Sequence, residues 1–527
     1  MSTANIDELR LLEDVVLRTI ANPTSSHGWH QMITLMRRHA TPAMSLELEK
    51  ILLARVAPDG LAGFYRATFL DMLTGRPEYL QQAGQIILRL QPFDADRLIT
   101  FLQNSWQRVL LDIPGRLAFQ QRLKALALPE IAAVLQQWLI QQIQPAQIFK
   151  KRVVREVRRV ALVAPFLSNI KHPPTLMALQ QAEILRRNDY EVVLYSAQEM
   201  LGPDFKHYLG SNSFTPDPEF VTRGWEAYLG QGGQVLTGDI RFSLQHRWKN
   251  LLGLMAQFDP DLVMSVGLYS GLAAAAYGAR PVLSLGINSL APMLPADVWL
   301  TALQELDKVQ ASQWSSAFPP SMAYYHSYRV QRPSVTPGCN RQTLGLPQDK
   351  LILVTLVSES EARIRDQWAA GMCDMLARHP QVIWLIVGGN GAMPSALQAV
   401  RAGQVRCLPF CLDAVNYLSC SDIYVNPPMM GGGFAVAEAM ALAVPALSLQ
   451  GSDGGDKLGD AALSDLQTYF QTLALWLSDA DLRKAAAQAM QQRFDQHLDL
   501  ARAAESLKAA CELTVQRFAI RTAAQTS

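Results

Sequence analysis

The segment DIYVNPPMMGGGFAVAEAMALAVPALSL at 422–449 is the most informative stretch of this chain. A short apolar run ends at Asn426, and three glycines at 431–433 open a run of small residues that is typical of a helix. Glycine lets the backbone approach a ligand closely, and a helix N-terminus offers free N–H groups with a positive partial charge. The pattern predicts a diphosphate-binding turn, with Glu438 placed to accept hydrogen bonds from ribose or sugar hydroxyls. The alternative is an ordinary glycine-rich turn followed by a solvated Glu438.

Strands and helices alternate on the N-terminal side of this segment. The runs LILVTLVS at 351–358 and VIWLIVGG at 382–389 are apolar without alternation, as in strands covered on both faces, and an amphipathic helix is expected at 363–379. The same order begins further upstream with VALVAPF at 160–166 and EVVLYS at 191–196. Repeated strand–helix–strand units of this length form parallel sheets, so two successive Rossmann-like domains are expected.

The residues before these units have a helical pattern. Leu9, Leu12, Val16 and Ile20 recur at intervals of three and four residues, the period of one buried helix face. The predicted fold is α/β, with two Rossmann-like domains facing a cleft, preceded by an all-α domain. The expected divisions are an all-helical domain at 1–150 for acceptor recognition or interaction, a first lobe at 151–335 on the acceptor side, a second lobe at 336–505 on the donor side, and a C-terminal helix at 506–527.

Composition restricts the class of protein. The chain has 527 residues, of which 49% are apolar and 18% charged, as in folded globular proteins. Its 47 basic and 46 acidic side chains give a net charge of +1, whereas nucleic-acid-binding surfaces usually carry a basic excess. Six scattered cysteines and a start, MSTANIDELR, without a basic-then-apolar signal segment favour a reducing cytoplasm. The longest apolar stretch is interrupted by prolines and Asp297, so no transmembrane segment is expected.

The end of the 422–449 segment resembles the donor-site signature of GT-B glycosyltransferases, which closes with a Glu, small residues and a Gly-Val-Pro turn. The matching residues here are EAMALAVP at 438–445. In the retaining group similar to glycogen synthase and sucrose synthase, this Glu contacts the nucleotide ribose, and Glu438 takes that position. That group has a second Glu eight positions earlier, near the donor sugar. This chain departs from the pattern with Met430.

The chain also resembles O-GlcNAc-transferase-like enzymes and the bacterial protein N-glycosyltransferases similar to them. These enzymes need no upstream Glu, join a helical domain to the two lobes, and carry a basic residue followed by Ile after the first strand of the second lobe. Arg363-Ile364 stands at the comparable place. The resemblance implies that Arg363 stabilises the leaving diphosphate, and the alternative is an ordinary exposed arginine. The resemblance to these glycosyltransferases covers roughly residues 155 to 510 and is strongest at 422–449.

Loops at the carboxyl ends of the predicted strands supply the other candidates, because open α/β sheets bind ligands at that edge. His172 follows the first strand and is the candidate base for the acceptor, although it could only shape a proline-rich loop. Thr175, Tyr269 and Asn288 are expected to contact the acceptor or the donor sugar. The predicted donor-binding residues are Arg363, Gly389, Asn390, Asn426, Gly431, Gly432, Gly433, Phe434 and Glu438. No metal site is expected.

The favoured hypothesis is a metal-independent bacterial glycosyltransferase, hexosyl- or N-acetylhexosaminyl-transferring. It would move a sugar from a nucleotide-sugar donor, UDP-linked, to a protein or glycan acceptor. No cofactor is expected beyond this co-substrate, and the partners are the donor and the acceptor without nucleic acid. The apolar helices could also bury a homo-oligomer interface. One alternative is a catalytically inactive GT-B binding partner or chaperone of another glycosyltransferase, and another is a nucleotide-sugar 2-epimerase.

Overall fold

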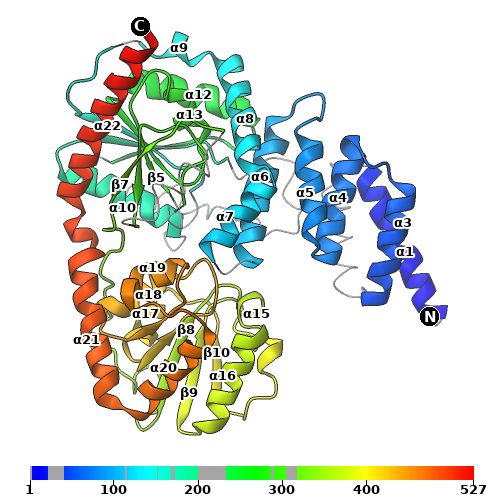
Figure 1. Ribbon diagram of the computed structural model, residues 1–527, viewed down its shortest axis with the longest axis vertical. Coiled ribbons are helices and arrows are strands. Elements are labelled where there is room, and N and C mark those ends of the chain that lie inside the picture. The colour runs from blue at the N-terminus through cyan, green and yellow to red at the C-terminus, as the bar shows by residue number, and fades with distance from the viewer. Residues whose placement is uncertain are drawn as a thin grey trace.

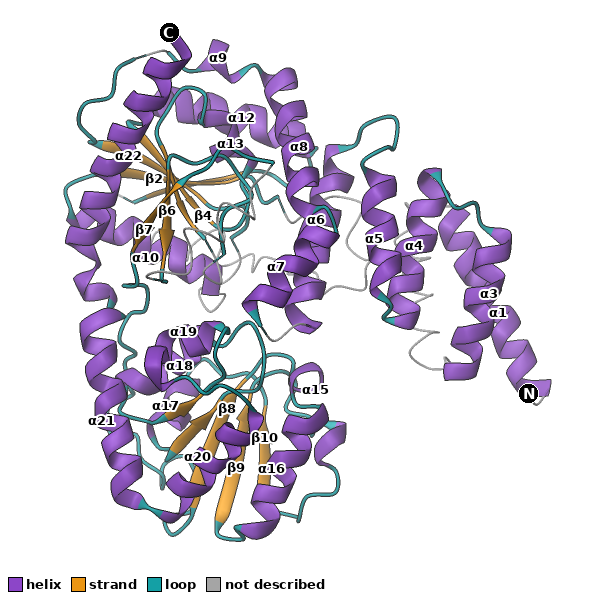
Figure 2. Cartoon of the chain, viewed as in Figure 1, coloured by secondary structure: helices purple, strands orange, loops and turns teal. Residues whose placement is uncertain are grey.

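The computed structural model describes residues 3–21, 41–112, 115–150, 152–167, 173–199, 233–286, 290–303 and 317–526. Two parallel β-sheets are each covered by helices, and a helical region precedes them (Figures 1 and 2). The predicted α/β fold, with two Rossmann-like domains and an N-terminal helical region, is confirmed.

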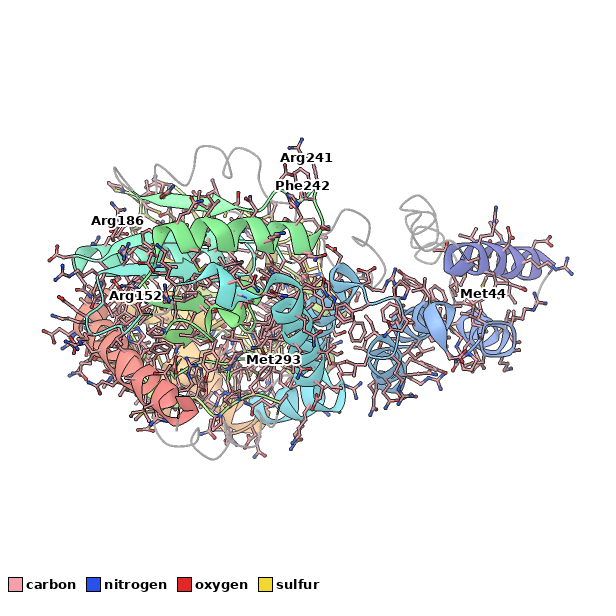
Figure 3. The ribbon with its side chains drawn as sticks, turned by 90° about the horizontal axis from the view of Figure 1, so that it is seen from above. Met44, Arg152, Arg186, Arg241, Phe242 and Met293 are labelled. Carbon is pink, nitrogen blue, oxygen red and sulfur yellow. The ribbon has the colours of Figure 1, made fainter. Side chains whose placement is uncertain are left out.

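The helical domain is defined here as the helices that precede the first sheet. They are α1 (Thr3–Ala21), α3 (Pro42–Arg55), α4 (Gly60–Thr74), α5 (Pro77–Ile87), α6 (Ala95–Asp112), α7 (Arg116–Ala125), α8 (Leu128–Ile143) and α9 (Pro145–Ile148). Proline begins several of them, and the Oγ1 of Thr41 caps α3 by accepting a hydrogen bond from the Met44 N–H at 3.3 Å. Seen from above, the arm that carries Met44 projects away from the body that contains Met293 (Figure 3).

None of the described helices is long and apolar enough by itself to cross a membrane, although the bent pair formed by residues 118–125 and 128–143 meets the length and composition requirement.

The first lobe is a seven-stranded parallel sheet in the order β3-β2-β1-β4-β5-β6-β7. Its strands are β1 (Arg159–Val163), β2 (Glu191–Ser196), β3 (Gln234–Thr237), β4 (Leu262–Val266), β5 (Val282–Leu285), β6 (Val298–Thr301) and β7 (Met322–Tyr325), with helices α10 (Pro173–Arg187), α12 (Leu244–Phe258) and α13 (Gly271–Ala276). Strands β3, β6 and β7 were not predicted from the sequence pattern. β6 follows an apolar stretch broken by prolines, and β3 and β7 are four-residue edge strands that are only partly buried.

The second lobe is a five-stranded parallel sheet in the order β10-β9-β8-β11-β12. Its elements are β8 (Leu351–Leu356), α15 (Ser360–Arg363), α16 (Asp366–Arg378), β9 (Val382–Val387), β10 (Val405–Leu408), α17 (Ala414–Ser419), β11 (Ile423–Val425), α18 (Gly433–Ala441), β12 (Ala446–Leu447), α19 (Asp453–Leu458), α20 (Leu466–Ser478) and α21 (Ala480–His497). The last helix of the chain, α22 (Ala503–Thr526), leaves this lobe.

One expected helix is shorter than predicted. The sequence pattern indicated a single helix at 363–379, but α16 begins at Asp366, and Arg363 is the last residue of the separate short helix α15. Asp366 has a φ of +55°, which a continuous helix does not allow, and the Ile364 side chain between the two helices is buried. Periodicity alone does not detect such a break.

Alternate residues of β1 join two different buried clusters. Ala161 and Val163 belong to a cluster that also contains α12, α13 and the helical domain, whereas Val160 and Leu162 belong to a cluster that also contains α22 residues such as Leu507. Helix α22 runs back from the second lobe along the first (Figure 1). The chain therefore crosses between the lobes twice. Helix α22 covers one face of the first sheet, and the helical domain packs on α12 and α13, which lie on the other face.

The end of α22 is held by an ion pair. Arg521 Nε donates to Asp297 Oδ1 at 2.8 Å, and Asp297 Oδ2 accepts from the Val282 N–H at 2.9 Å. Burial raises the pKa of the Asp297 carboxyl and the guanidinium opposes this rise. We expect Arg521→Gln to lower the free energy of unfolding by about 3 kcal/mol, because it leaves a buried acid without its cation. The exposed control Arg401→Gln, which lies in the other lobe, should change it by less than about 0.5 kcal/mol in urea titrations. Equal effects of the two substitutions would contradict this account.

Candidate functional site

The glycine turn after β11 is shaped by contact with Asn426. This buried residue continues the strand, since its N–H donates to the Leu447 carbonyl at 3.0 Å, and its Nδ2 donates to Ser448 Oγ at 2.9 Å. Gly432 has a φ of +88°, and a Cβ on it would lie 2.4 Å from Asn426 Oδ1. Both its conformation and its contact with the amide therefore require glycine at this position.

Helix α18 begins at this turn without a side-chain cap. Its N-cap is Gly432, which has no side chain to accept a hydrogen bond from the first turn. The first N–H groups of a helix have no partner within the helix. Beside them, Gly431 is only partly buried, and a Cβ on it would have no atom within 4 Å. The turn can therefore offer backbone N–H groups and the positive end of the helix dipole to an anion.

The glycine turn lies on the side of the second lobe that faces the first. Helices α15, α18 and α19 occupy this side (Figure 1). Phe434 packs against the apolar clusters of both lobes. Met430 is fully buried and belongs to the same cluster as Leu268 and Tyr269, which follow β4 of the first lobe. The residue in place of the usual Glu therefore takes part in apolar packing between the lobes.

Glu438 lies one turn further along α18 and is half-buried. Its charge acts on Tyr424 of β11, whose pKa is raised above its ordinary value first by burial and also by Glu438. The Tyr424 hydroxyl lies 3.4 Å from Asn426 Oδ1. Glu438, Tyr424 and Asn426 are thus neighbours at the carboxyl end of β11.

The other predicted donor residues lie on adjacent strands. Gly389, with a φ of +57°, follows β9, and a Cβ on it would lie 2.8 Å from the Ser358 carbonyl oxygen. Asn390 is exposed, and its Oδ1 accepts from the Ala392 N–H at 3.0 Å. Arg363 makes a contact that the sequence did not predict, because its Nη1 donates to the Leu110 carbonyl in α6 at 3.2 Å.

The predicted acceptor residues are only partly described. Thr175 is buried in α10 and Tyr269 is buried after β4. His172 and Asn288 lie outside the described residues. The Tyr269 hydroxyl has no hydrogen-bond partner in the part of the chain that the structure describes.

Glu199, which follows β2 by three residues, was not predicted from the sequence. Its Oε1 accepts from Trp248 Nε1 at 2.8 Å and from the Gly271 N–H at 2.9 Å, whereas Oε2 has no partner among the described residues. Burial raises the pKa of Glu199 to about 7. It also raises the pKa of Tyr269, and the charge of Glu199 adds to this effect. The sequence feature that could have indicated Glu199 is an acidic residue three positions after a predicted buried strand.

The charged residues of α19 were also not predicted from the sequence. The run GSDGGDK at 451–457, shortly after β12, combines glycines with charged residues, which is typical of a ligand-binding turn. The Asp453 N–H donates to the Met430 carbonyl at 2.9 Å, and a Cβ on Gly433 would lie 3.0 Å from Asp453 Cβ. Helix α19 therefore starts against the glycine turn. No three His, Cys, Asp or Glu side chains of the described residues are grouped to hold a metal ion.

Comparison with solved structures relates this architecture to known proteins. A Thermobaculum terrenum O-GlcNAc transferase mutant is similar along the whole chain, with 12% identity, a TM-score of 0.52, and coverage of 99% of this chain and 100% of that chain. The chain has the GT-B glycosyltransferase fold. A glycosyltransferase from Rickettsia africae ESF-5 is similar over 68% of this chain and 98% of its own, with 11% identity and a TM-score of 0.47. No family model and no curated protein matches the chain.

Two glycines of the turn, Gly432 and Gly431, allow a substitution and a matched control to be compared in this GT-B fold. Gly432→Ala should lower the free energy of unfolding by at least about 1–2 kcal/mol, because alanine is strained at positive φ and its Cβ meets the Asn426 amide. Gly431→Ala has no such contact and should change it by less than about 0.5 kcal/mol. Urea titration of both variants measures the difference. A Gly432→Ala protein as stable as Gly431→Ala would contradict the described turn.

Glu199 makes the stability of the GT-B fold pH-dependent. Its pKa rises from 4.5 to about 7 in the folded chain, so the native state binds a proton more tightly than the unfolded state. Stability from this group is fully present below about pH 4.5 and is lost as the pH rises through about 7. Glu199→Gln should therefore stabilise the protein at pH 8 by up to about 3 kcal/mol, with little gain at pH 4.5. Unfolding of wild type, Glu199→Gln and the exposed control Glu505→Gln at both pH values tests this, and a gain independent of pH would refute it.

Proposed function

We propose that this protein transfers a sugar from a nucleotide-sugar donor, UDP-linked, to a protein or glycan acceptor. The observation that carries the proposal is the glycine turn, where Gly432 packs on Asn426 and opens the uncapped helix α18. The GT-B fold supports it, because this turn lies at the carboxyl end of a central strand of the second sheet, where open α/β sheets bind ligands.

The chemistry of the reaction explains the use of such a turn. In sugar transfer the bond between the anomeric carbon and a diphosphate oxygen breaks, and the diphosphate leaves as an anion while the acceptor bonds to the anomeric carbon. Backbone N–H groups at the start of α18 would stabilise that developing charge. Glu438 would accept hydrogen bonds from the ribose hydroxyls, with Gly389 and Asn390 beside the base.

The proposed acceptor side is the first lobe. His172 would take the acceptor's proton, with Thr175, Tyr269 and Asn288 near the acceptor or the donor sugar. The helical domain would contribute to acceptor recognition. The transferred group is proposed to be a hexose or an N-acetylhexosamine.

A second candidate function is a catalytically inactive GT-B partner of another transferase. Met430 favours it, because an apolar side chain buried between the lobes stands where retaining relatives are expected to carry a Glu. Such a protein would bind a partner, and nucleotide binding would be lost or without turnover.

Nucleotide binding tests the proposal directly. Thermal unfolding of the wild type is measured with UDP, GDP, ADP and CMP, and repeated with Glu438→Ala and the exposed control Glu505→Ala. A nucleotide at 100 times its dissociation constant should stabilise the wild type and the control by roughly 2.7 kcal/mol. The Glu438→Ala protein should show a smaller shift, because it loses the proposed contact with the ribose.

The outcomes separate the two candidate functions. If no nucleotide at millimolar concentration stabilises the wild type, the donor site is absent and the inactive partner is favoured. A transferase should be stabilised by UDP. It should also release UDP from a UDP-sugar in the presence of acceptor proteins.

A further inference from the structure

Charged side chains from three parts of the chain meet beside the glycine turn. Two acids and three cations act on one another there, and they are Asp453, Asp456 and Lys457 of α19, Arg116 of the helical domain, and Arg329, which follows β7 of the first lobe. With all five ionised, the cluster has a surplus of one positive charge. Burying unbalanced charge is unfavourable, so this surplus favours an anionic ligand.

Arg116 joins the helical domain to α19. Its side chain pairs with Asp456, and both side chains are only 7% exposed. Its backbone N–H also donates to the Gly451 carbonyl at 2.7 Å, in the loop that leads into α19. The charge of Asp456 is therefore balanced by a residue from another domain. Asp456 Oδ2 and Arg116 Nε are buried and have no hydrogen-bond partner among the described residues.

Arg329 is held at the carboxyl edge of the first sheet. Its Nη1 and Nη2 donate to the carbonyls of Gly286 and Leu300 at 3.3 and 2.9 Å, and its Nε donates to the His326 carbonyl at 3.1 Å. These bonds fix the guanidinium, whose charge acts on Lys457 of the other lobe. Arg329 of the first lobe and Lys457 of the second are therefore close enough for their charges to interact.

Lys457 differs from Arg116 and Arg329, whose side chains have hydrogen-bond or ion-pair partners. It is buried, with 8% of the residue exposed, and within the described part of the chain its ammonium makes no hydrogen bond or ion pair. Burial lowers the pKa of Lys457 to about 8, and the charge of Arg329 contributes. Asp453, four residues earlier on the same helix, has a pKa raised to about 7 by burial and by Asp456, so near neutral pH it balances Lys457 only in part.

We propose that Lys457 binds the diphosphate of the donor and that Arg116 positions it from the helical domain. This inference rests on the proposed function and deepens it, because Asp453 contacts the glycine turn at Gly433 and its charge acts on Lys457, one turn further along α19. By pairing with Asp456, Arg116 keeps that acid from neutralising the Lys457 ammonium. The ligand class is a sugar diphosphate, whose charged oxygens suit Lys457 and whose hydroxyls suit the unpartnered Asp456 Oδ2. The helical domain is then part of the donor site.

Calorimetric binding of UDP, uridine and inorganic pyrophosphate to the full chain tests the inference. Lys457→Met should weaken UDP binding by roughly 10- to 100-fold, as expected for a charge-assisted hydrogen bond, and leave uridine binding unchanged. Lys457→Arg should restore most of the affinity, and the exposed control Lys484→Met should bind UDP like wild type. Arg116→Met should weaken UDP and pyrophosphate, but not uridine, by roughly 3- to 10-fold. A role of Arg116 in stability alone would affect all three ligands alike.

A second measurement needs no variant and therefore no assumption about folding. Acetic anhydride modifies amines that solvent reaches, so mass spectrometry of the wild type should show slow acetylation of Lys457, with 8% of the residue exposed, and fast acetylation of Lys484. UDP should protect Lys457 while uridine does not, and Lys484 should react equally in both cases. If wild type and Lys457→Met bind UDP equally, or if UDP leaves Lys457 unprotected while it binds, the inference is wrong and the proposed function stands. If the wild type binds no nucleotide, the proposed function itself fails.

Discussion

The contact between Gly432 and the amide of Asn426 determines how the second lobe presents its ligand-binding edge. Asn426 is fixed on both sides, by the ladder bond to Leu447 and by the Ser448 hydroxyl, so it cannot move away from the turn. The chain can pass it only with a glycine in the left-handed conformation. Helix α18 therefore starts at the turn that follows β11, without a side-chain cap, and lies on the side of the second lobe that faces the first (Figure 1).

The helical domain contacts the second lobe at two points. Arg116 reaches α19, and Arg363 of α15 reaches back to the Leu110 carbonyl in α6. On the far side of the first sheet, α22 ties the end of the chain to Asp297. The relative position of the lobes is thus held by polar contacts at several points.

Several features of the site could be predicted from local sequence and others could not. The glycine turn and the position of Glu438 on α18 follow from residue types at short spacing, which fix strand, turn and helix. Arg363 was predicted on a long helix near the diphosphate, yet it ends a short helix and bonds to a residue 253 positions away. The charges of α19 were present in the sequence, but their partners Arg116 and Arg329 come from other domains.

The sequence by itself determined most of the alternating strands and helices, the two parallel sheets and the turn that opens α18, because periodicity and glycine conformation are properties of neighbouring residues. Only the tertiary structure decided that Met430 is buried between the lobes, that Glu199 lies in a low-dielectric site, and that cations from three parts of the chain converge on α19. Burial and electrostatic interaction depend on distances through space, and a spacing of hundreds of residues along the chain carries no information about them.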